Sequence, residues 1–140
     1  MIVCKFGGSA TASKTAVDNL KKLKNDERII WVFSAIGKEF DGDVKLTDLL
    51  IAYTRKNSNK TKIKQQIKNK FTRLKKNTNV DVDTDKFIDE YCNKFDNDLN
   101  KDYFISRGEY LTSLIMSKYL DIKFVSAEKI IFSKNNKMNN

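Results

Sequence analysis

The chain begins with a lysine and two glycines placed where a short strand should end. Residues 2–6, Ile-Val-Cys-Lys-Phe, are typical of a strand, and Gly7-Gly8-Ser9 follow directly. Because glycine lacks a Cβ, such a turn can take positive φ, admit a ligand close to the backbone and point successive N–H groups at phosphate oxygens. Lys5 would add a compact positive charge beside it. The block therefore predicts a phosphate-binding turn, although a glycine pair after a strand is also common in ordinary tight turns.

Three more polar residues could act on a ligand, and each also has a purely structural explanation. Ser34 opens the loop after an apolar strand, and open α/β sheets bind ligands outside the carboxyl ends of their strands. Thr47 precedes a helical pattern and has the residue type of an N-cap. Ser106 and Glu109 have the spacing of a capping box at the start of a helix. For each of these residues considered alone, the structural explanation is preferred over a role in ligand binding.

The elements that must position these residues begin with two strands and a helix. Strands are expected at 2–6 and 29–33, with a helix from about Lys14 between them. Residues 29–33, Ile-Ile-Trp-Val-Phe, are apolar throughout, which is typical of a strand buried on both faces of a parallel sheet. Strand, helix and strand form a βαβ unit with a right-handed crossover. The Gly7-Gly8 turn and the loop at 34–38 then leave neighbouring strand ends and should border one crevice.

The rest of the chain is predicted to be mainly helical. Apolar residues recur at helical spacing in two stretches, the first with Ile63, Ile67, Phe71 and Leu74 and the second with Phe87, Ile88, Tyr91, Phe95 and Leu99. The stripes predict a helical hairpin within an insert at about 55–100. A further helix is expected from Ser106, a third strand at 122–126, and a short strand or strand end at 130–132.

The net charge of +9 raises the possibility of a protein that binds nucleic acid. Much of the excess lies between Arg55 and Lys76, whereas the second helix of the hairpin carries four acidic residues between positions 83 and 90. Opposite charges on the two helices should attract each other. Among the basic residues only Phe71, at a core position, could stack on a base. A solvated helix face with an acidic neighbour therefore ranks above specific nucleic-acid binding.

Length and composition indicate one soluble cytoplasmic domain. A chain of 140 residues suffices for one core, and no stretch approaches the roughly 20 apolar residues of a membrane span. The amino terminus has strand character and lacks the pattern of a signal peptide. The two cysteines, Cys4 and Cys92, are too few for a disulfide framework, and the absence of histidine argues against a zinc site of the usual kind.

Together these blocks resemble the amino-terminal part of aspartate kinase. The blocks are Lys5-Phe6-Gly7-Gly8-Ser9, Phe33-Ser34-Ala35, Thr47-Asp48-Leu49-Leu50, Ser106-Arg107-Gly108-Glu109 and Phe124-Val125-Ser126-Ala127, in the order and rough spacing of that family. The resemblance covers nearly all of residues 1–140 and is least diagnostic at 55–100. It implies the amino-acid-kinase fold, a three-layer α/β/α sandwich with a mainly parallel sheet, here truncated and carrying the helical hairpin.

The resemblance also implies a reaction and a role for each matched residue. Aspartate kinases use ATP and Mg²⁺ to phosphorylate the side-chain carboxylate of L-aspartate to 4-phospho-L-aspartate, the first step toward lysine, threonine and methionine. Lys5 matches the catalytic lysine that neutralises charge on the transferring phosphoryl group, as phosphoryl transfer requires. The ATP-binding segment would consist of Lys5, Phe6, Gly7, Gly8 and Ser9. Thr47 would contact aspartate, Glu109 would bind its α-ammonium, and Ser34 would line the same pocket; no residue is assigned to a metal.

The resemblance stops before the second half of the kinase domain. Ala10 replaces a hydroxyl residue that is usual in the family, and nothing in the chain matches the glycine-rich nucleotide segment, the arginine for the α-carboxylate of aspartate or the regulatory domains. The chain is therefore expected to be a fragment without appreciable kinase activity of its own. Unpaired strand edges are expected to self-associate into a homo-oligomer or to pair with a complementing second half.

Three alternatives remain open at this point. Another member of the amino-acid-kinase superfamily would act on glutamate, carbamate or a nucleoside monophosphate, although Thr47-Asp48 and Gly108-Glu109 favour aspartate kinase. A basic nucleic-acid-binding module would use residues 55–76. An inactive interaction fragment would bind a partner that supplies the missing half.

Overall fold

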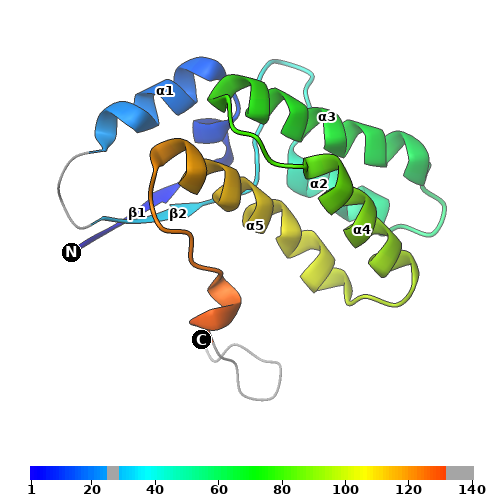
Figure 1. Ribbon diagram of the computed structural model, residues 1–140. Helices are drawn as coiled ribbons and strands as arrows, with labels where there is room; N and C mark the ends of the chain where they lie inside the picture. The colour runs from blue at the N-terminus through cyan, green and yellow to red at the C-terminus, as the bar shows by residue number, and fades with distance from the viewer. Residues whose placement is uncertain (25–28, 132–140) are drawn as a thin grey trace.

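The structure of the chain is a computed structural model that describes residues 1–24 and 29–131. Two strands, β1 (Ile2–Phe6) and β2 (Ile29–Phe33), pair in parallel and lie beside a body of helices (Figure 1). The helices are η1 (Gly8–Thr11), α1 (Lys14–Leu23), α2 (Leu46–Tyr53), α3 (Lys60–Thr78), α4 (Thr84–Asp96), α5 (Lys101–Leu120) and η2 (Ala127–Lys129). The predicted α/β class and the parallel pairing of two strands joined by a helix are confirmed.

The pairing register gives the sheet one covered face and one open face. Phe6 lies opposite Phe33 in the ladder and stacks on Trp31, with ring centroids 4.9 Å apart. The other face presents three apolar side chains with exposed fractions of 64%, 45% and 42%: Val3, Ile30 and Val32. The prediction that the second strand is buried on both faces is therefore wrong, because the described helices cover only one side of the sheet.

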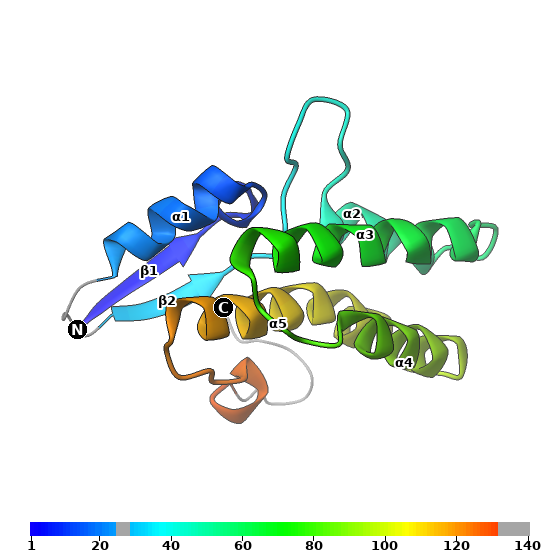
Figure 2. The ribbon, with the colours of Figure 1, turned by 45° about the horizontal axis from the view of Figure 1, so that its top comes forward.

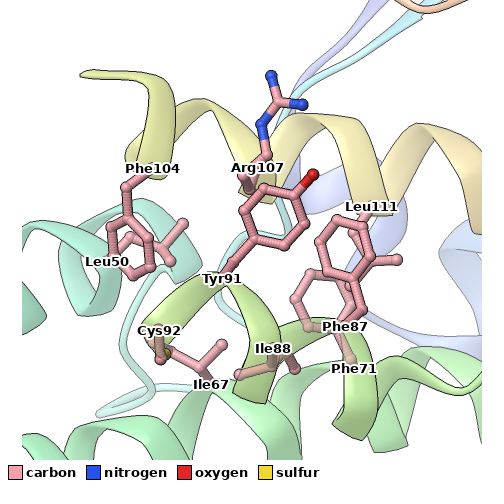
Figure 3. Close-up of a pocket in the computed structure, with 11 residues that line it drawn as sticks. Leu50, Ile67, Phe71, Phe87, Ile88, Tyr91, Cys92, Phe104, Arg107 and Leu111 are labelled. Atoms are coloured by element: carbon pink, nitrogen blue, oxygen red, sulfur yellow. The ribbon is translucent and has the colours of Figure 1, made fainter. Parts of the chain in front are cut away.

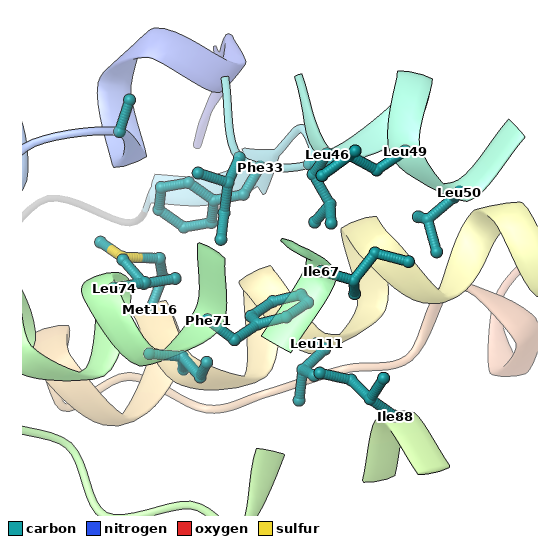
Figure 4. Close-up of a cluster of buried hydrophobic side chains, with 14 of the residues drawn as sticks. Phe33, Leu46, Leu49, Leu50, Ile67, Phe71, Leu74, Ile88, Leu111 and Met116 are labelled. Carbon is teal, nitrogen blue, oxygen red and sulfur yellow. The ribbon is translucent and has the colours of Figure 1, made fainter. Parts of the chain in front are cut away.

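The core lies where α2, α3 and α5 meet the covered face of the sheet. Its members have exposed fractions of 6% or less and include Phe33, Leu46, Leu49, Leu50, Ile67, Phe71, Leu74, Ile88, Leu111 and Met116 (Figure 4). Helix α1 joins the same layer, since the Tyr119 hydroxyl of α5 donates to Asp18 of α1 over 2.9 Å. The described residues thus build the sheet and one helical layer of the three-layer sandwich.

Helices α3 and α4 form the predicted hairpin and are joined by the predicted charge attraction. The Asp83 side chain caps the start of α4 by accepting from Lys86 N–H over 3.0 Å. Across the pair, the Asp89 carboxylate lies 2.7 Å from the ammonium of Lys68 and 3.2 Å from that of Lys64. The basic run of α3 is therefore partly neutralised within the chain.

The predicted capping box at Ser106 and Glu109 is wrong. Helix α5 begins at Lys101, and the Asn100 side chain caps it by accepting from two backbone N–H groups at 2.9 and 3.1 Å. Ser106 lies inside the helix, where its hydroxyl donates to the carbonyl of Tyr103 over 2.7 Å. Asparagine caps a helix as well as serine does, and the earlier of the two capping signals marks the true start.

The segment after α5 is not a strand. Residues 122–126 have no ladder partner among the described residues, and η2 follows them. A strand needs a neighbour for its N–H and C=O groups, and β1 and β2 pair with each other. Phe124 instead packs edge-on against Tyr110 of α5, with ring centroids 5.2 Å apart. The strands expected at 122–126 and 130–132 are therefore wrong, apart from residue 132, which lies outside the described residues.

Candidate functional site

The turn after β1 and the loop after β2 touch each other at the carboxyl ends of the two strands. Residues 7 and 8 form what is called here the glycine turn, and residues 34–45 form the β2–α2 loop, which projects beyond the end of the sheet (Figure 2). Gly37 N–H donates to the carbonyl of Gly8 over 2.8 Å, and Ser34 N–H donates to the carbonyl of Phe6 over 3.0 Å. The predicted juxtaposition of the two loops is therefore confirmed.

The two glycines of the turn have different surroundings: backbone atoms leave no room for a side chain at Gly8, whereas the space around Gly7 is open. A Cβ at Gly8 would lie 2.5 Å from the carbonyl oxygen of Ala35 and 2.8 Å from the nitrogen of Gly37, so the backbones approach too closely for any other residue. At Gly7, φ is −69°, and a Cβ would meet nothing within 4 Å. Neither glycine uses positive φ, contrary to expectation. Gly7 instead borders open space, where a ligand can come close to the backbone.

Lys5 lies at the same edge, on the open face of the sheet. Its side chain is exposed, and its ammonium lies 3.5 Å from the hydroxyl of Ser34. The ring of Phe6 packs on the covered face of the sheet, so only the backbone of Phe6 adjoins the turn. The N–H groups of Gly8 and Ser9 open η1 and have no backbone acceptor among the described residues. A cation and two N–H donors, groups of the kind that bind phosphate, thus lie on neighbouring residues at this edge of the sheet.

Helix α5 crosses directly over the β2–α2 loop at Gly108. A Cβ built at Gly108 would lie 2.8 Å from Cδ1 of Leu50, 3.3 Å from Cβ of Ala35 and 3.4 Å from Cδ2 of Leu46. Glycine at this position lets the helix backbone pack against α2 and the loop together. The contact brings α5 against the loop and α2, which lie much earlier in the sequence, next to the glycine turn.

Thr47 and Glu109 adjoin this contact. Thr47 follows Leu46 in the chain and Glu109 follows Gly108, and both residues are half-buried. Thr47 was expected to cap α2, but this expectation is wrong: α2 begins at Leu46, and Lys45 holds the cap position without a side-chain hydrogen bond. The structure thus brings the backbones of Thr47 and Glu109 to the loop that begins at Ser34.

A buried ion pair that sequence reasoning missed fastens the β2–α2 loop to α3. The ammonium of Lys70 donates to the carbonyl of Gly37 over 2.7 Å and to the carboxylate of Asp43 over 2.5 Å, and the two side chains are 2% and 9% exposed. The signal was present in the apolar stripe, because Lys70 lies three residues after Ile67 and four before Leu74. A lysine on the buried side of a helix needs an internal partner.

Burial and hydrogen bonding shift the pKa of both members of this ion pair. Burial alone would raise the pKa of Asp43, but hydrogen bonds from Lys70 and from the N–H groups of Glu39 and Val44 outweigh burial and hold the pKa at about 2. Burial lowers the pKa of Lys70 below its usual value, although the neighbouring carboxylate of Asp43 opposes that shift. The carboxylate is therefore ionised throughout the physiological range.

The cavity between α3, α4 and α5 does not belong to this site. It has a volume of about 20 Å³ and is lined mainly by apolar side chains (Figure 3). Arg107, at its rim, directs its guanidinium outward to Glu128 of η2, 2.5 Å away, and over the ring of Tyr103, 3.9 Å from the ring centroid. The cavity is a packing gap in the core, and Arg107 joins the segment after α5 to that helix.

Two other kinds of feature are absent from the part of the chain that the structure describes. In residues 1–24 and 29–131, no three His, Cys, Asp or Glu side chains gather in a way that could hold a metal ion. None of the helices in these ranges combines the length and the apolar character needed to cross a membrane.

Comparison with known proteins assigns a family to this architecture. A family model described as the amino acid kinase family matches residues 1–140. A comparison with curated proteins gave no match. Among solved structures, the aspartate kinase of Clostridium acetobutylicum is similar with a TM-score of 0.78 and 30% sequence identity, over 89% of this chain and 30% of that one.

Two structures of aspartokinase III from E. coli share the fold at lower identity. The complex with lysine and aspartate gives a TM-score of 0.65 at 17% identity, over 88% of this chain and 30% of that one. The complex with aspartate and ADP gives a TM-score of 0.64 at 18% identity, over 86% of this chain and 29% of that one. The chain thus spans about 30% of the length of the kinases it matches.

Proposed function

The chain belongs to the amino acid kinase family, and from that premise we propose that it forms the amino-terminal part of an aspartate kinase. The reaction is transfer of the γ-phosphoryl group of ATP to the side-chain carboxylate of L-aspartate, which gives 4-phospho-L-aspartate and ADP on the route to lysine, threonine and methionine. The 30% identity to the Clostridium acetobutylicum enzyme supports aspartate as the acceptor.

The contact between the glycine turn, the β2–α2 loop and α5 carries this proposal. Phosphoryl transfer depends on positioned charge more than on covalent chemistry. In the proposed complex Lys5 neutralises the transferring phosphoryl group, and the N–H groups of Gly8 and Ser9 bind phosphate oxygens. Gly7, which borders open space, leaves room for the nucleotide to approach the backbone.

The acceptor would lie on the side of the loop that faces α5. Glu109 binds the α-ammonium of aspartate in this proposal, and such a charge-assisted contact selects an amino acid over a plain dicarboxylate. Thr47 contacts the substrate through its hydroxyl, and Ser34 lines the space between donor and acceptor. The Gly108 contact supports this arrangement because it keeps α5 against the loop.

Mg²⁺ would reach the site with the nucleotide. The ion commonly keeps several waters and is held by one or two carboxylates together with substrate phosphates. Residues 1–24 and 29–131 show no cluster of three or more metal-ligating side chains and so do not fit a metal site of their own. The roles proposed above therefore involve protein groups alone.

A binding experiment tests the donor and acceptor sides separately. Amide resonances of the ¹⁵N-labelled chain are followed by NMR while ATP with Mg²⁺, L-aspartate or succinate is added. The nucleotide should shift the amides of Gly7, Gly8 and Ser9 first. Aspartate should shift amides near Glu109 more strongly than succinate does, because succinate lacks the ammonium group.

Matched variants make the result specific. Lys5→Met should abolish the shifts caused by the nucleotide, whereas Lys118→Met, which removes an exposed charge on α5, should leave them unchanged. Glu109→Gln should remove the preference for aspartate over succinate. Nucleotide shifts that spread over the lysines of α3 would indicate nonspecific charge and would contradict the proposal.

Turnover tests the fragment itself. ADP release from ATP and L-aspartate should not be detectable with the 140-residue chain alone, and it should appear when the rest of an aspartate kinase catalytic domain is supplied as a second polypeptide. Phosphorylation of aspartate by the chain alone would refute its assignment as an incomplete kinase.

A further inference from the structure

The β2–α2 loop links the two sides of the proposed active site. A Cβ at Gly37 would lie 2.6 Å from the carbonyl carbon of Gly8, so loop and turn are in close backbone contact. At the far end the loop leads into Leu46, the residue before Thr47, and Leu46 N–H donates back to the carbonyl of Ile36 over 3.0 Å. A shift of this loop would therefore move the glycine turn and the start of α2 together.

Lys70 ties this loop to α3 from inside the molecule. Its ammonium donates to the carbonyl of Gly37 over 2.7 Å and to Asp43 over 2.5 Å. Among the lysines of α3, a helix that the structure describes in full, Lys70 alone is buried. A buried ammonium is unfavourable unless it is paired and hydrogen-bonded, and here the loop provides both partners.

Asp43 folds the loop around that ammonium. Its carboxylate accepts from the N–H groups of Glu39 and Val44 at 2.9 and 2.8 Å. Gly42, the preceding residue, has φ of +85°, a conformation that favours glycine. Arg73 of α3 lies 3.4 Å from the outer side of the same carboxylate. The loop is thus closed on itself and fastened to α3 through Lys70 and Arg73, whose guanidinium also lies 3.2 Å from the carboxylate of Glu39.

We propose that Lys70 is a positioning residue for the phosphate-binding turn: it holds the Gly37 peptide against Gly8 without touching substrate. The effect on nucleotide binding rests on the proposed function, whereas the positioning of the loop is a property of the chain itself. Loss of the ammonium should loosen the contact between Gly37 and Gly8. Nucleotide binding should weaken as a result, because preorganised N–H donors depend on fixed geometry.

Amide hydrogen exchange and nucleotide titration of the same variants test this proposal. Lys70→Met removes the ammonium at similar side-chain length, and Lys70→Met/Asp43→Asn also avoids a lone buried carboxylate. The matched control is Lys64→Met on the same helix, because the Asp89 side chain with which Lys64 pairs is 49% exposed. Gly37 N–H should exchange roughly tenfold faster in both Lys70 variants, while core amides of α5 keep their protection.

The second readout is the affinity for ATP with Mg²⁺, followed at Gly7 and Gly8. The Kd should rise roughly tenfold in the Lys70 variants, and the Lys64→Met control should match the wild type in both readouts. Wild-type exchange at Gly37 in the paired variant would overturn the proposal, even if the single variant unfolds. Faster exchange at Gly37 with unchanged nucleotide affinity would overturn it as well.

The two readouts separate this proposal from the proposed function. If the wild-type chain binds no nucleotide even when the rest of an aspartate kinase catalytic domain is supplied as a second polypeptide, the proposed function fails. Exchange at Gly37 then still decides whether Lys70 positions the loop, because that hydrogen bond to Gly8 exists without a ligand.

Discussion

The helical body of the chain and its two-stranded sheet bury apolar side chains to very different extents. In the helices, Phe71 and Leu111 are 2% and 1% exposed. On the open face of the sheet, Val3 and Ile30 are 64% and 45% exposed. Because burial of apolar surface is the main source of folding free energy, the helices stabilise the chain and the sheet depends on them.

The residues that stabilise the fold and most residues of the proposed site lie in different regions of the molecule. Lys5, the glycine turn and Ser34 lie at strand ends and loops, as binding residues commonly do on a rigid scaffold. Helix α5 contributes both to stability and to the proposed site, because Gly108 packs in the core and the next residue, Glu109, is proposed to bind the substrate. Substitutions should therefore divide into those that unfold the chain and those that change only its binding of ligands or partners.

Truncation of a core side chain should have the largest effect on stability. Phe71→Ala should lower the free energy of unfolding by about 3–5 kcal/mol, because it removes a buried ring and leaves a cavity. Val32→Ala on the open face should change it by less than about 0.5 kcal/mol. Urea unfolding followed by circular dichroism measures both. Equal losses would refute the division between the helical body and the sheet.

The two cysteines report on the two regions directly. Cys92 of α4 is 2% exposed, and burial raises the pKa of its thiol to about 11, whereas Cys4 of β1 is half-buried. Since the thiolate is the reactive form, native Cys92 should react with a disulfide reagent at about pH 8 roughly 100-fold more slowly than it does in the denatured chain. Cys4→Ser and Cys92→Ser assign the two phases. Rapid modification of native Cys92 would show that the helical body opens easily.

Low pH should destabilise the β2–α2 loop, which connects the sheet to the helical body. Despite burial, hydrogen bonds from Lys70 and the backbone hold the pKa of Asp43 at about 2, below its usual value of 3.8. A carboxylate with a lowered pKa stabilises the fold above its unfolded pKa, and this contribution is lost as the pH falls through the folded pKa. Between about pH 5 and pH 2 the wild type should lose about 2 kcal/mol more than Asp43→Asn does. Parallel stability curves in urea would contradict this expectation.

Local patterns predicted most of the elements, and features that depend on neighbours were missed. The strands 2–6 and 29–33 and the helical hairpin follow from apolar runs and helical spacing, which are properties of short stretches. The burial of β2 depends on what covers each face of the sheet, and an apolar run does not reveal this. The segment 122–126 has strand-like residues but no partner strand among the described residues.

Only part of the candidate site could be predicted from the sequence, because its other features depend on tertiary contacts. The glycine turn and Ser34 follow strands, so their meeting could be inferred from the parallel topology. Competing signals at Asn100 and Ser106 placed the helix start wrongly. Lys70 was missed because a lysine in a basic helix is normally solvated, and only tertiary contact shows that its ammonium enters the β2–α2 loop.

Substitutions on the open face of the sheet should change the free energy of unfolding least. They also test most directly whether that face is exposed in solution. Exposed apolar side chains beside unpaired strand edges promote association between copies. The wild type should therefore elute from a size-exclusion column as a species larger than a monomer, increasingly so at higher concentration. Ile30→Lys/Val32→Lys should elute as a monomer, with a free energy of unfolding within about 1 kcal/mol of wild type per substitution, because position 32 pairs with Lys5 and the two charges repel.

The control for this experiment adds the same charge elsewhere. Thr61→Lys/Thr72→Lys places two lysines on exposed positions of α3, away from the sheet, and should associate as the wild type does. If the control also becomes monomeric, added net charge rather than the sheet face governs association. A wild type that stays monomeric at high concentration would refute the prediction, because it would show that the exposed side chains of Val3, Ile30 and Val32 do not drive association between copies.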